Sequence, residues 1–318
     1  MNRILLVTAT SDLAADLIIL NLERRGLPFT RVNQEDFPQR ISITWPGKGE
    51  GAMIAVDDEM ISCCDEIRSA WFRSAAFPQP VLQDDRRTAE FVSQECAGFL
   101  AGFWETMPWF WINRPSALAR ASSKLWQLAL ADAHGFRVPR TLVTNCARTA
   151  RDFVRGGESI AKAVVSSGFR EAGRRYAIFT TPITSEDLSD EAVRSAPVIY
   201  QERIANRFDL RVTVVGERVF ASRISSSNAA RPETDWRAVD PAHIVYDIFP
   251  LPSALEAACV KYVRAHSLIF AALDFIITPE GDYVFLEINP SGQWGWLEEA
   301  TGAPITDAIV DCLAKGDA

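Results

Sequence analysis

Residues 271–294 read AALDFIITPEGDYVFLEINPSGQW, and this stretch decides the fold that we expect. Two apolar runs flank a polar turn, which is the pattern of a β-hairpin. If Glu280-Gly281 forms a two-residue loop, the register places Asp274 directly opposite Glu287, and a symmetric four-residue loop gives the same pairing. Opposed like charges destabilise a sheet, and an unpaired charge in an apolar strand is costly. A bound cation would resolve both problems.

Asn289 adds a third oxygen donor to this pair. It lies two residues after Glu287, so side-chain alternation along a strand puts both on one face of the sheet. Together with Asp274, these donors suit Mg²⁺, which binds few protein oxygens and completes its octahedron with water and substrate phosphates. The alternative is that the two carboxylates merely solubilise the hairpin. The register and the Pro290-Ser291-Gly292 turn that follows favour a metal site.

The N-terminal part of the chain has the pattern of an α/β unit. Residues 3–9 and 28–33 have strand patterns, and residues 12–25 between them have helical spacing. This order resembles a Rossmann-like half, yet the sequence lacks the G-x-G-x-x-G motif, so dinucleotide binding gains little support. A hairpin over residues 41–56 and a strand over 67–72 follow.

The middle and C-terminal parts mix helices and strands. We expect a helix over residues 85–105 and another that is capped by Ser122 or Ser123 and runs to Gly135. From Pro139 the pattern becomes strand-rich. Short strands are expected at 141–145, 160–165, 176–181 and 197–201, with a helix over 185–196 and, in 208–318, two hairpins and a C-terminal helix.

Composition excludes several classes of protein. With 318 residues, 48% hydrophobic and 23% charged, the chain has a globular composition, and its length predicts about two domains. A net charge of -8 has the wrong sign for binding nucleic acid through its phosphates. No apolar run is long enough to span a membrane, and no signal peptide is recognised. Six cysteines without a CxxC pair indicate buried thiols, so we expect a cytoplasmic protein.

The hairpin motif resembles that of the ATP-grasp ligases, whose final hairpin carries an Asp and then an E-x-N-P strand. More narrowly, EINPSGQWGWLE at 287–298 resembles the N-P-x-G-Q-W-x-W signature of graspetide or microviridin-type maturases, RimK-like ligases that cross-link ribosomally made peptides. The resemblance implies a mixed α/β and α+β ATP-grasp fold. Its parts would be a Rossmann-like pre-grasp domain at 1–112, a central α+β lid at 113–201 and a C-terminal α+β catalytic unit at 202–318.

The resemblance also assigns nucleotide-binding residues. Lys124 and Lys162 match the two nucleotide-binding lysines, and an ammonium group within an apolar strand, as at Lys162, is costly unless it meets a phosphate. The Gly-containing loop at Ser167 and Gly168 lets backbone N–H groups approach phosphate oxygens. VIYQERI resembles the adenine hinge. The remaining cofactor-binding residues that it implies are Gln201, Glu202, Ile204 and Asp209.

Catalytic and substrate-binding residues follow from the same resemblance. Arg211 would meet the γ-phosphate, although a surface ion pair with Asp209 on the same strand face is the alternative. The D-W-R element would place Arg237 beside the acceptor carboxylate or the transferred phosphate. Substrate-binding residues would be Trp236, Gln293 and Trp294, with an aromatic ring excluding water from an acylphosphate, while anchoring of the C-terminal helix is the alternative for the tryptophan.

The implied reaction is an ATP-dependent ligation with Mg²⁺. A substrate Asp or Glu would attack the γ-phosphate of ATP, and a Ser/Thr hydroxyl or Lys amine of the same precursor peptide would displace phosphate. Two alternatives remain: a RimK-like ligase that adds a free amino acid to a protein or small-molecule carboxylate, and a nucleotide-sensing protein without chemistry. The expected partners are a precursor peptide whose leader docks on the acidic segment 185–196, and a second copy that binds through 91–103 and 109–111, with no nucleic acid and no membrane.

Overall fold

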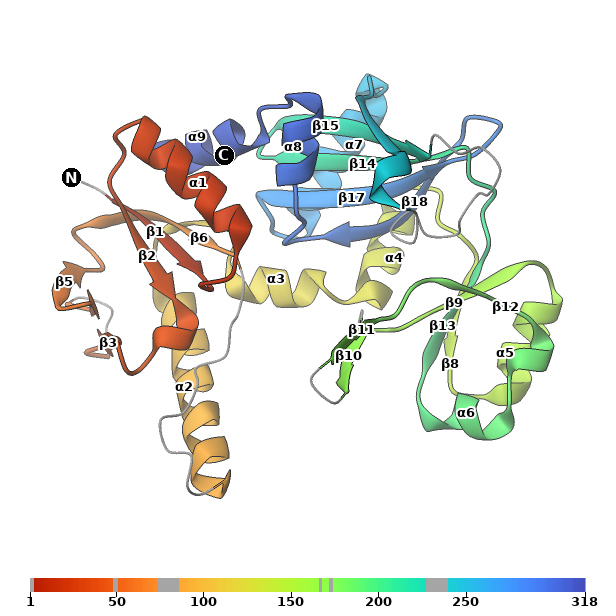
Figure 1. The fold of residues 1–318 in the computed structure, drawn as a ribbon, viewed down its shortest axis with the longest axis horizontal. Helices are drawn as coiled ribbons and strands as arrows, with labels where there is room; N and C mark the ends of the chain where they lie inside the picture. Colours follow the sequence, from red (N-terminus) through yellow and green to blue (C-terminus); the bar gives the residue numbers. More distant parts are fainter. Residues whose placement is uncertain are drawn as a thin grey trace.

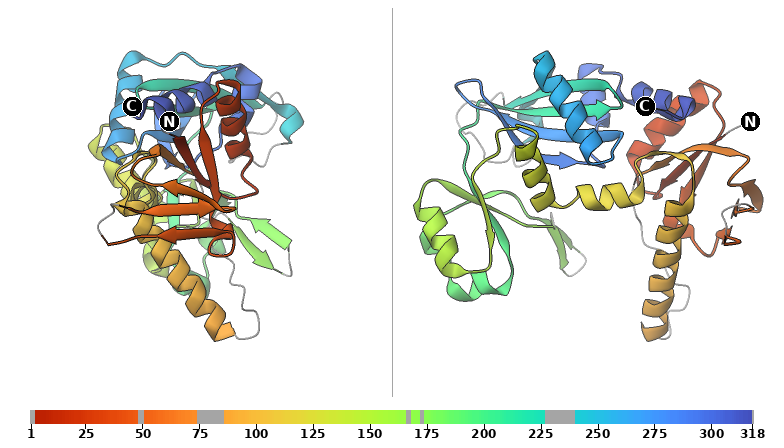
Figure 2. Two further views of the ribbon diagram at one scale, coloured as in Figure 1. Left: turned by 90° about the vertical axis from the view of Figure 1, so that its left-hand side faces the viewer. Right: turned by 180° about the vertical axis from the view of Figure 1, so that it is seen from behind.

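The computed structural model describes residues 3–47, 51–73, 86–165, 168–171, 174–226 and 240–317. Three bodies make up the molecule (Figure 1): an N-terminal body, a C-terminal sheet beside it, and a central body that lies below that sheet. Helices α3 and α4 connect the first body to the other two, and the view from behind shows the same arrangement (Figure 2). This is the mixed α/β and α+β organisation that the sequence predicts.

The N-terminal body is built on a four-stranded parallel sheet of order β2-β1-β6-β7. The expected strand–helix–strand opening is confirmed, since β1 is almost entirely buried and α1 begins at the N-cap Asp12. A small antiparallel sheet, β3-β4-β5, packs beside it. The elements are β1 (Arg3–Thr8), α1 (Leu13–Arg24), β2 (Phe29–Asn33), η1 (Gln34–Asp36), β3 (Ile41–Thr44), β4 (Met53–Val56), β5 (Glu59–Ser62), β6 (Ile67–Phe72), α2 (Arg86–Thr106) and β7 (Phe110–Ile112).

The central body is an antiparallel sheet of order β12-β9-β13-β8, with α5 and α6 packed on one face. A separate hairpin, β10-β11, extends from it (Figure 1). The elements from the connecting helices onward are α3 (Pro115–Ala121), α4 (Lys124–Ala133), β8 (Thr141–Thr144), α5 (Ala147–Arg155), β9 (Ser159–Lys162), β10 (Gly168–Glu171), β11 (Arg174–Ala177), β12 (Thr181–Ile183), η2 (Ser185–Asp187), α6 (Asp190–Ser195) and β13 (Val198–Glu202).

The C-terminal body is a five-stranded antiparallel sheet of order β16-β15-β14-β17-β18. Its central strands are buried along nearly their whole length because helices cover one face. Asp274 is the one position of β17 that is not buried. The elements are β14 (Phe208–Val215), β15 (Arg218–Ser226), η4 (Pro241–His243), β16 (Ile244–Ile248), α7 (Ser253–Ala265), β17 (Phe270–Ile277), β18 (Tyr283–Asn289), α8 (Gly295–Thr301) and α9 (Ile305–Lys315).

The predicted pairing of Asp274 with Glu287 is confirmed, but the predicted loop is wrong. Ile277 pairs with Tyr283, and the Thr278 N–H donates to the Asp282 carbonyl, so the loop has the three residues 279–281 instead of two. A β-bulge follows, since Phe275 pairs with Phe285 whereas its neighbour Asp274 pairs with Glu287. The bulge adds one residue on β18 and restores the register that a two-residue loop would have given.

The C-terminal segment is more helical than the sequence predicts. Instead of one terminal helix, the structure has α7, α8 and α9, and β16 extends the sheet. Helix α9 returns to the N-terminal body, where its apolar face packs against α1 and β1 in one shared core. The expected burial of the thiols holds for three cysteines, while Cys64 and Cys146 are exposed. Among the described residues, no helix is long and apolar enough to cross a membrane.

Candidate active site

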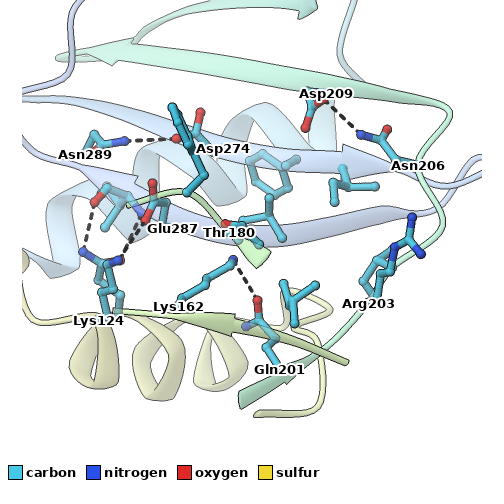
Figure 3. A pocket seen from close by; sticks show the side chains of 18 of the residues that line it. Lys124, Lys162, Thr180, Gln201, Arg203, Asn206, Asp209, Asp274, Glu287 and Asn289 are labelled. Atoms are coloured by element: carbon cyan, nitrogen blue, oxygen red, sulfur yellow. Dashed lines mark hydrogen bonds and ion pairs between the residues drawn. The ribbon is translucent and has the colours of Figure 1, made fainter. Parts of the chain in front are cut away.

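A cavity of about 700 Å³ lies between the C-terminal sheet and the central sheet (Figure 3). Strands β17 and β18 form one wall, β9 and β13 form the facing wall, and α4 closes one end. The structure brings most of the predicted site residues to this cavity. Those that line it are Lys124, Lys162, Gln201, Glu202, Ile204, Asp209, Arg211, Asp274, Glu287 and Asn289.

A row of three charged residues crosses the five-stranded C-terminal sheet. Arg211 pairs with Asp274 across β14 and β17, and Asp274 pairs with Glu287 across β17 and β18. The Arg211 Nη1 donates to both carboxylate oxygens of Asp274, at 2.8 Å each. Asn289 Nδ2 donates to the same carboxylate at 3.0 Å. The arginine therefore supplies a counter-charge for one of the two opposed carboxylates that led us to expect a cation.

Glu287 completes the row beside the first lysine. Its carboxylate lies 4.0 Å from Lys124 Nζ, which also donates to the carbonyl of Ala163 at 3.1 Å. Among the described residues, no three His, Cys, Asp or Glu side chains cluster as metal ligands. A divalent ion here would therefore need the amide oxygen of Asn289 beside Asp274 and Glu287. This all-oxygen donor set fits Mg²⁺.

Lys162 extends from β9 toward the middle of the cavity (Figure 3). Its Nζ donates to Gln201 Oε1 at 2.9 Å, and Gln201 Nε2 donates to Thr141 Oγ1 at 2.9 Å. Thr141 in turn donates to the carbonyl of Pro139. A chain of hydrogen bonds thus fixes the direction of the ammonium group, with a neutral amide as the acceptor.

The predicted adenine hinge lies at the end of β13. The N–H of Glu202 donates to the backbone carbonyl of Arg140, and the N–H of Arg203 donates to the backbone carbonyl of Glu158. Both N–H groups are therefore already hydrogen-bonded within the protein. In the part of the chain that the structure describes, the N–H of Ile204 has no backbone acceptor. The Glu202 carboxylate accepts from the Arg140 N–H at 3.2 Å. Of these three N–H groups, the one that we expect to donate to the base is therefore that of Ile204.

The remaining wall combines apolar side chains with one acidic group. Ile160, Ile276 and Leu286 provide apolar surface on both sides of the cavity, which suits a planar base. Leu286 is the extra residue of the β18 bulge, and this lets it line the cavity beside its neighbour Glu287. Asp209 accepts from Asn206 Nδ2 at 3.0 Å, so the predicted surface pair with Arg211 does not form.

Several predicted residues are not at the cavity. Gly168 lies at the start of β10, and Gln293 is exposed; neither lines the cavity. Trp294 is fully buried against Trp71 and Phe270, so its predicted contact with substrate is wrong. Apolar packing accounts for this, since the ring belongs to the core shared by α1 and α9. The predictions for Ser167, Trp236 and Arg237 lie outside the described residues.

Sequence reasoning missed Gln127, which supports strand β18. Its side-chain Nε2 donates to the backbone carbonyl of Ile288 at 3.0 Å, and its Oε1 accepts from the backbone N–H of Ile288 at 3.3 Å. It also donates to the carbonyl of Ala121. The available signal was its position three residues after Lys124 in α4, which places both on one helix face.

Comparison with protein families gives a match for the N-terminal part of the chain. Residues 3–119 match the MvdD pre-ATP grasp domain. A search of curated proteins found no match.

Solved structures match over nearly the full chain. Macrocyclase MdnC from Microcystis aeruginosa, bound to the precursor peptide MdnA, is 26% identical with a TM-score of 0.86, covering 98% of this chain and 99% of its own. A RiPP-associated ATP-grasp ligase from Chryseobacterium gregarium, in complex with ADP, a leader and a core peptide, is 27% identical with a TM-score of 0.89, covering 100% and 98%. Macrocyclase MdnB from Microcystis aeruginosa is 28% identical, with a TM-score of 0.81 and coverage of 98% and 99%. Residues 3–119 thus match an MvdD-type pre-ATP grasp domain, and over nearly its whole length the chain is similar in sequence and fold to solved ATP-grasp ligases.

Proposed function

We propose that this ATP-grasp ligase closes macrolactone or macrolactam cross-links in a ribosomally made precursor peptide. The observation that carries this proposal is the cavity that Lys124 and Lys162 line together with the Arg211/Asp274/Glu287 row, in a chain similar to MdnC and to the Chryseobacterium ligase. The cations suit a nucleoside triphosphate, and the carboxylates suit its metal ion. ATP and Mg²⁺ are the proposed cofactors.

The reaction has two steps, and no enzyme group forms a covalent bond. An oxygen of a substrate Asp or Glu carboxylate attacks the γ-phosphorus of ATP, and the bond to ADP breaks. A Ser/Thr hydroxyl or Lys amine of the same peptide then attacks the acyl carbon, releases phosphate and loses its proton. Lys162 and Arg211 offset the negative charge that spreads over the transferring phosphoryl group, and the apolar wall holds the base. The carboxylates of Glu202 and Asp209 are proposed to accept hydrogen bonds from the hydroxyls of a bound ribose.

The metal would be held by Asp274, Glu287 and Asn289. When bound it would supply positive charge at the phosphate oxygens and align them. The chain's own contribution is to bring these three side chains together from two neighbouring strands, because β18 carries both Glu287 and Asn289 on the face that meets Asp274.

Mass spectrometry of a precursor peptide tests the function. We expect the cognate leader-bearing peptide, incubated with enzyme, ATP and Mg²⁺, to lose the mass of one water for each ring and to release one ADP per ring. A peptide that gains an amino-acid residue would instead indicate a RimK-like ligase. An unchanged peptide with bound but unhydrolysed ATP would indicate a nucleotide sensor.

The leader is proposed to dock on the acidic segment 185–196 of the central body. Helix α6 places Asp190 and Glu191 in its first turn, and Asp190 is already paired with Arg151 and Arg194. Glu191 on the same exposed turn is thus available to a basic leader side chain. Glu191→Lys should reduce processing of a leader-bearing peptide while leaving nucleotide binding at the wild-type level.

A homodimer is proposed through α2. The helix projects from the N-terminal body (Figures 1 and 2) and exposes Phe91 and Phe99. Trp109 and Trp111, which we expected at this interface, are buried in the N-terminal core and cannot contribute. Phe91→Glu should convert a dimer into a monomer in sedimentation velocity, and a wild-type monomer at micromolar concentration would contradict the proposal.

A further inference from the structure

The turn that follows β18 holds the catalytic arginine in place. A Cβ built on Gly292 would lie 2.7 Å from Arg211 Nη2 and 2.7 Å from the Ala272 Cβ, so the guanidinium packs directly on the glycine backbone. The same Nη2 donates to the Gln293 carbonyl at 3.4 Å. The position of Arg211 therefore depends on the conformation of residues 290–293.

Arg73 of the N-terminal body binds this turn. It directly follows β6, and its Nη1 donates to the carbonyls of Ser291 and Gly292. Its side chain is only 4% exposed and lies with its guanidinium carbon 5.3 Å above the Trp294 ring. Arg73 is too deeply buried to contact a substrate. It can act only through the residues that it holds.

A carboxylate on the opposite side fixes the orientation of Arg73. Asp12 Oδ2 lies 3.4 Å from Arg73 Nε and accepts from Thr8 Oγ1 at 3.0 Å, while Asp12 Oδ1 caps α1 at Ala14. Burial lowers the pKa of Arg73, Asp12 raises it, and the nearby positive charge of Arg211 lowers it. The two arginines are thus close enough to feel each other's charge across the turn.

A second residue of the N-terminal body supports the other end of the turn. Asn113 directly follows β7 and donates to the carbonyls of Pro290, at 3.1 Å, and Phe270, at 2.7 Å. Its Oδ1 accepts from the N–H groups of Ile269 and Phe270. The turn is therefore bonded at its start and at its middle by side chains from the ends of two parallel strands.

We propose that Arg73 is a positioning residue for phosphoryl transfer, which sets the 290–293 turn and through it the direction of the Arg211 guanidinium. The inference rests on the proposed role of Arg211 at the γ-phosphate. It gives the N-terminal body a part in the chemistry, because the two carbonyls that Arg73 holds belong to the residues against which Arg211 packs. A guanidinium can bond both carbonyls and Asp12 together, whereas an ammonium group lacks this fork.

Arg73→Lys tests the proposal, with Arg31→Lys as the matched control. Arg31 also binds a carboxylate, of Asp16, and two backbone carbonyls, of Ala9 and Thr10, and within the described part of the chain its hydrogen bonds do not reach the turn. We expect Arg73→Lys to lower kcat by about tenfold or more while KM for ATP changes by less than about threefold. Arg31→Lys should leave kcat within about twofold of wild type. Unchanged kcat in Arg73→Lys would overturn the proposal.

A double-mutant cycle separates positioning from general stability. If Arg73 acts through Arg211, adding Arg73→Lys to Arg211→Lys should lower kcat by less than the product of the two single effects. Multiplicative effects, accompanied by a lower melting temperature, would show a structural role and refute the proposal. Asp12→Asn keeps the helix cap and gives a milder variant, which should lower kcat in the same direction should Arg73→Lys fail to fold. Failure of the wild-type protein to bind ADP would instead overturn the proposed function.

Discussion

The two walls of the cavity hold their cations in different ways. On the C-terminal sheet, which forms the catalytic wall of the cavity, Arg211 is buried and forms an ion pair with both carboxylate oxygens of Asp274. Asn289 also donates to this carboxylate. On the central sheet, Lys162 is half-buried and donates to the neutral amide of Gln201. One wall thus pairs its cation with a carboxylate, and on the other wall the cation donates to an amide oxygen.

This difference divides the work of binding between the walls. A phosphate can replace the Gln201 oxygen at Lys162 with a gain in charge pairing, because a charged acceptor is stronger than a neutral one. A metal ion that reaches Asp274 must share a carboxylate with Arg211. Under the proposed function, the central sheet would capture the nucleotide, and a metal ion at Asp274 would couple its own binding to the orientation of Arg211.

Removing a carboxylate from the catalytic wall should have the largest effect. Glu287→Gln and Asp274→Asn should each lower kcat by about 10²-fold or more, since each removes a proposed metal ligand. Their stabilities should differ. Asp274→Asn leaves the buried Arg211 without a counter-charge and should cost about 3 kcal/mol, whereas Glu287→Gln should be close to neutral.

Coupled ADP-release assays across a Mg²⁺ titration and urea unfolding measure the two quantities. Glu217→Gln, in an exposed ion pair with Arg264, is the control and should match wild type in both. Wild-type turnover of Glu287→Gln at saturating Mg²⁺ would remove this residue from the metal site.

Removing the lysine from the central wall should act on affinity instead. Lys162→Met should weaken ATP binding by about 10- to 100-fold, as expected for a charged hydrogen bond, with little change in the free energy of unfolding. Isothermal titration calorimetry and the shift in melting temperature with ATP and Mg²⁺ measure this. The exposed Lys261 of α7 provides the control, Lys261→Met. Equal affinities in the two variants would contradict the proposed role of Lys162.

Gly292→Ala tests how tightly the catalytic wall is packed. The new Cβ would meet the Arg211 guanidinium and Ala272 at 2.7 Å, so we expect about a tenfold loss of kcat and a destabilisation of about 1–3 kcal/mol. Gly98→Ala in α2, where a Cβ would meet nothing within 4 Å, should keep full activity. A fully active Gly292→Ala would show that the arginine can move without penalty.

The smallest effect should come from the amide that orients Lys162. Gln201→Met removes the acceptor and keeps the backbone of β13, so ATP affinity should fall by only about three- to tenfold. Lys162→Met combined with Gln201→Met should bind ATP no more weakly than Lys162→Met alone. If the second substitution weakens binding further, Gln201 contacts the nucleotide by a route independent of the lysine.

Much of the fold could be read from the sequence because local patterns determined it. The strand–helix–strand opening and the opposed Asp274/Glu287 pair both follow from alternation and apolar periodicity. The loop length did not follow, since a three-residue turn with a compensating bulge gives the same pair as a two-residue turn. The longer loop and the bulge shift the register in opposite directions, and a pattern of alternating residues reveals neither of them.

The site residues divide along the same line. Lys124 and Arg211 could be found through the resemblance to ATP-grasp ligases, and Lys162 also because a charged residue within an apolar strand is conspicuous. Trp294 was misplaced because burial depends on what packs around the ring, and its neighbours Trp71 and Phe270 are distant in sequence. Arg73 was missed for the same reason, since its partners at Ser291 and Gly292 lie more than 200 residues away.

Helix α9 has a consequence for how the chain acquires its structure during synthesis. Its residues Ile305, Ile309 and Leu313 complete a core that begins with Ile4 and Leu6, so the first strand and the last helix need each other. Contacts between residues so far apart in the sequence form late in folding, because bringing the two segments together costs the conformational entropy of the chain between them. Until α9 follows, this face of the N-terminal sheet is covered by α1 without its second helix. We therefore expect newly synthesised chains to expose apolar surface of this sheet until the C-terminal helix has docked.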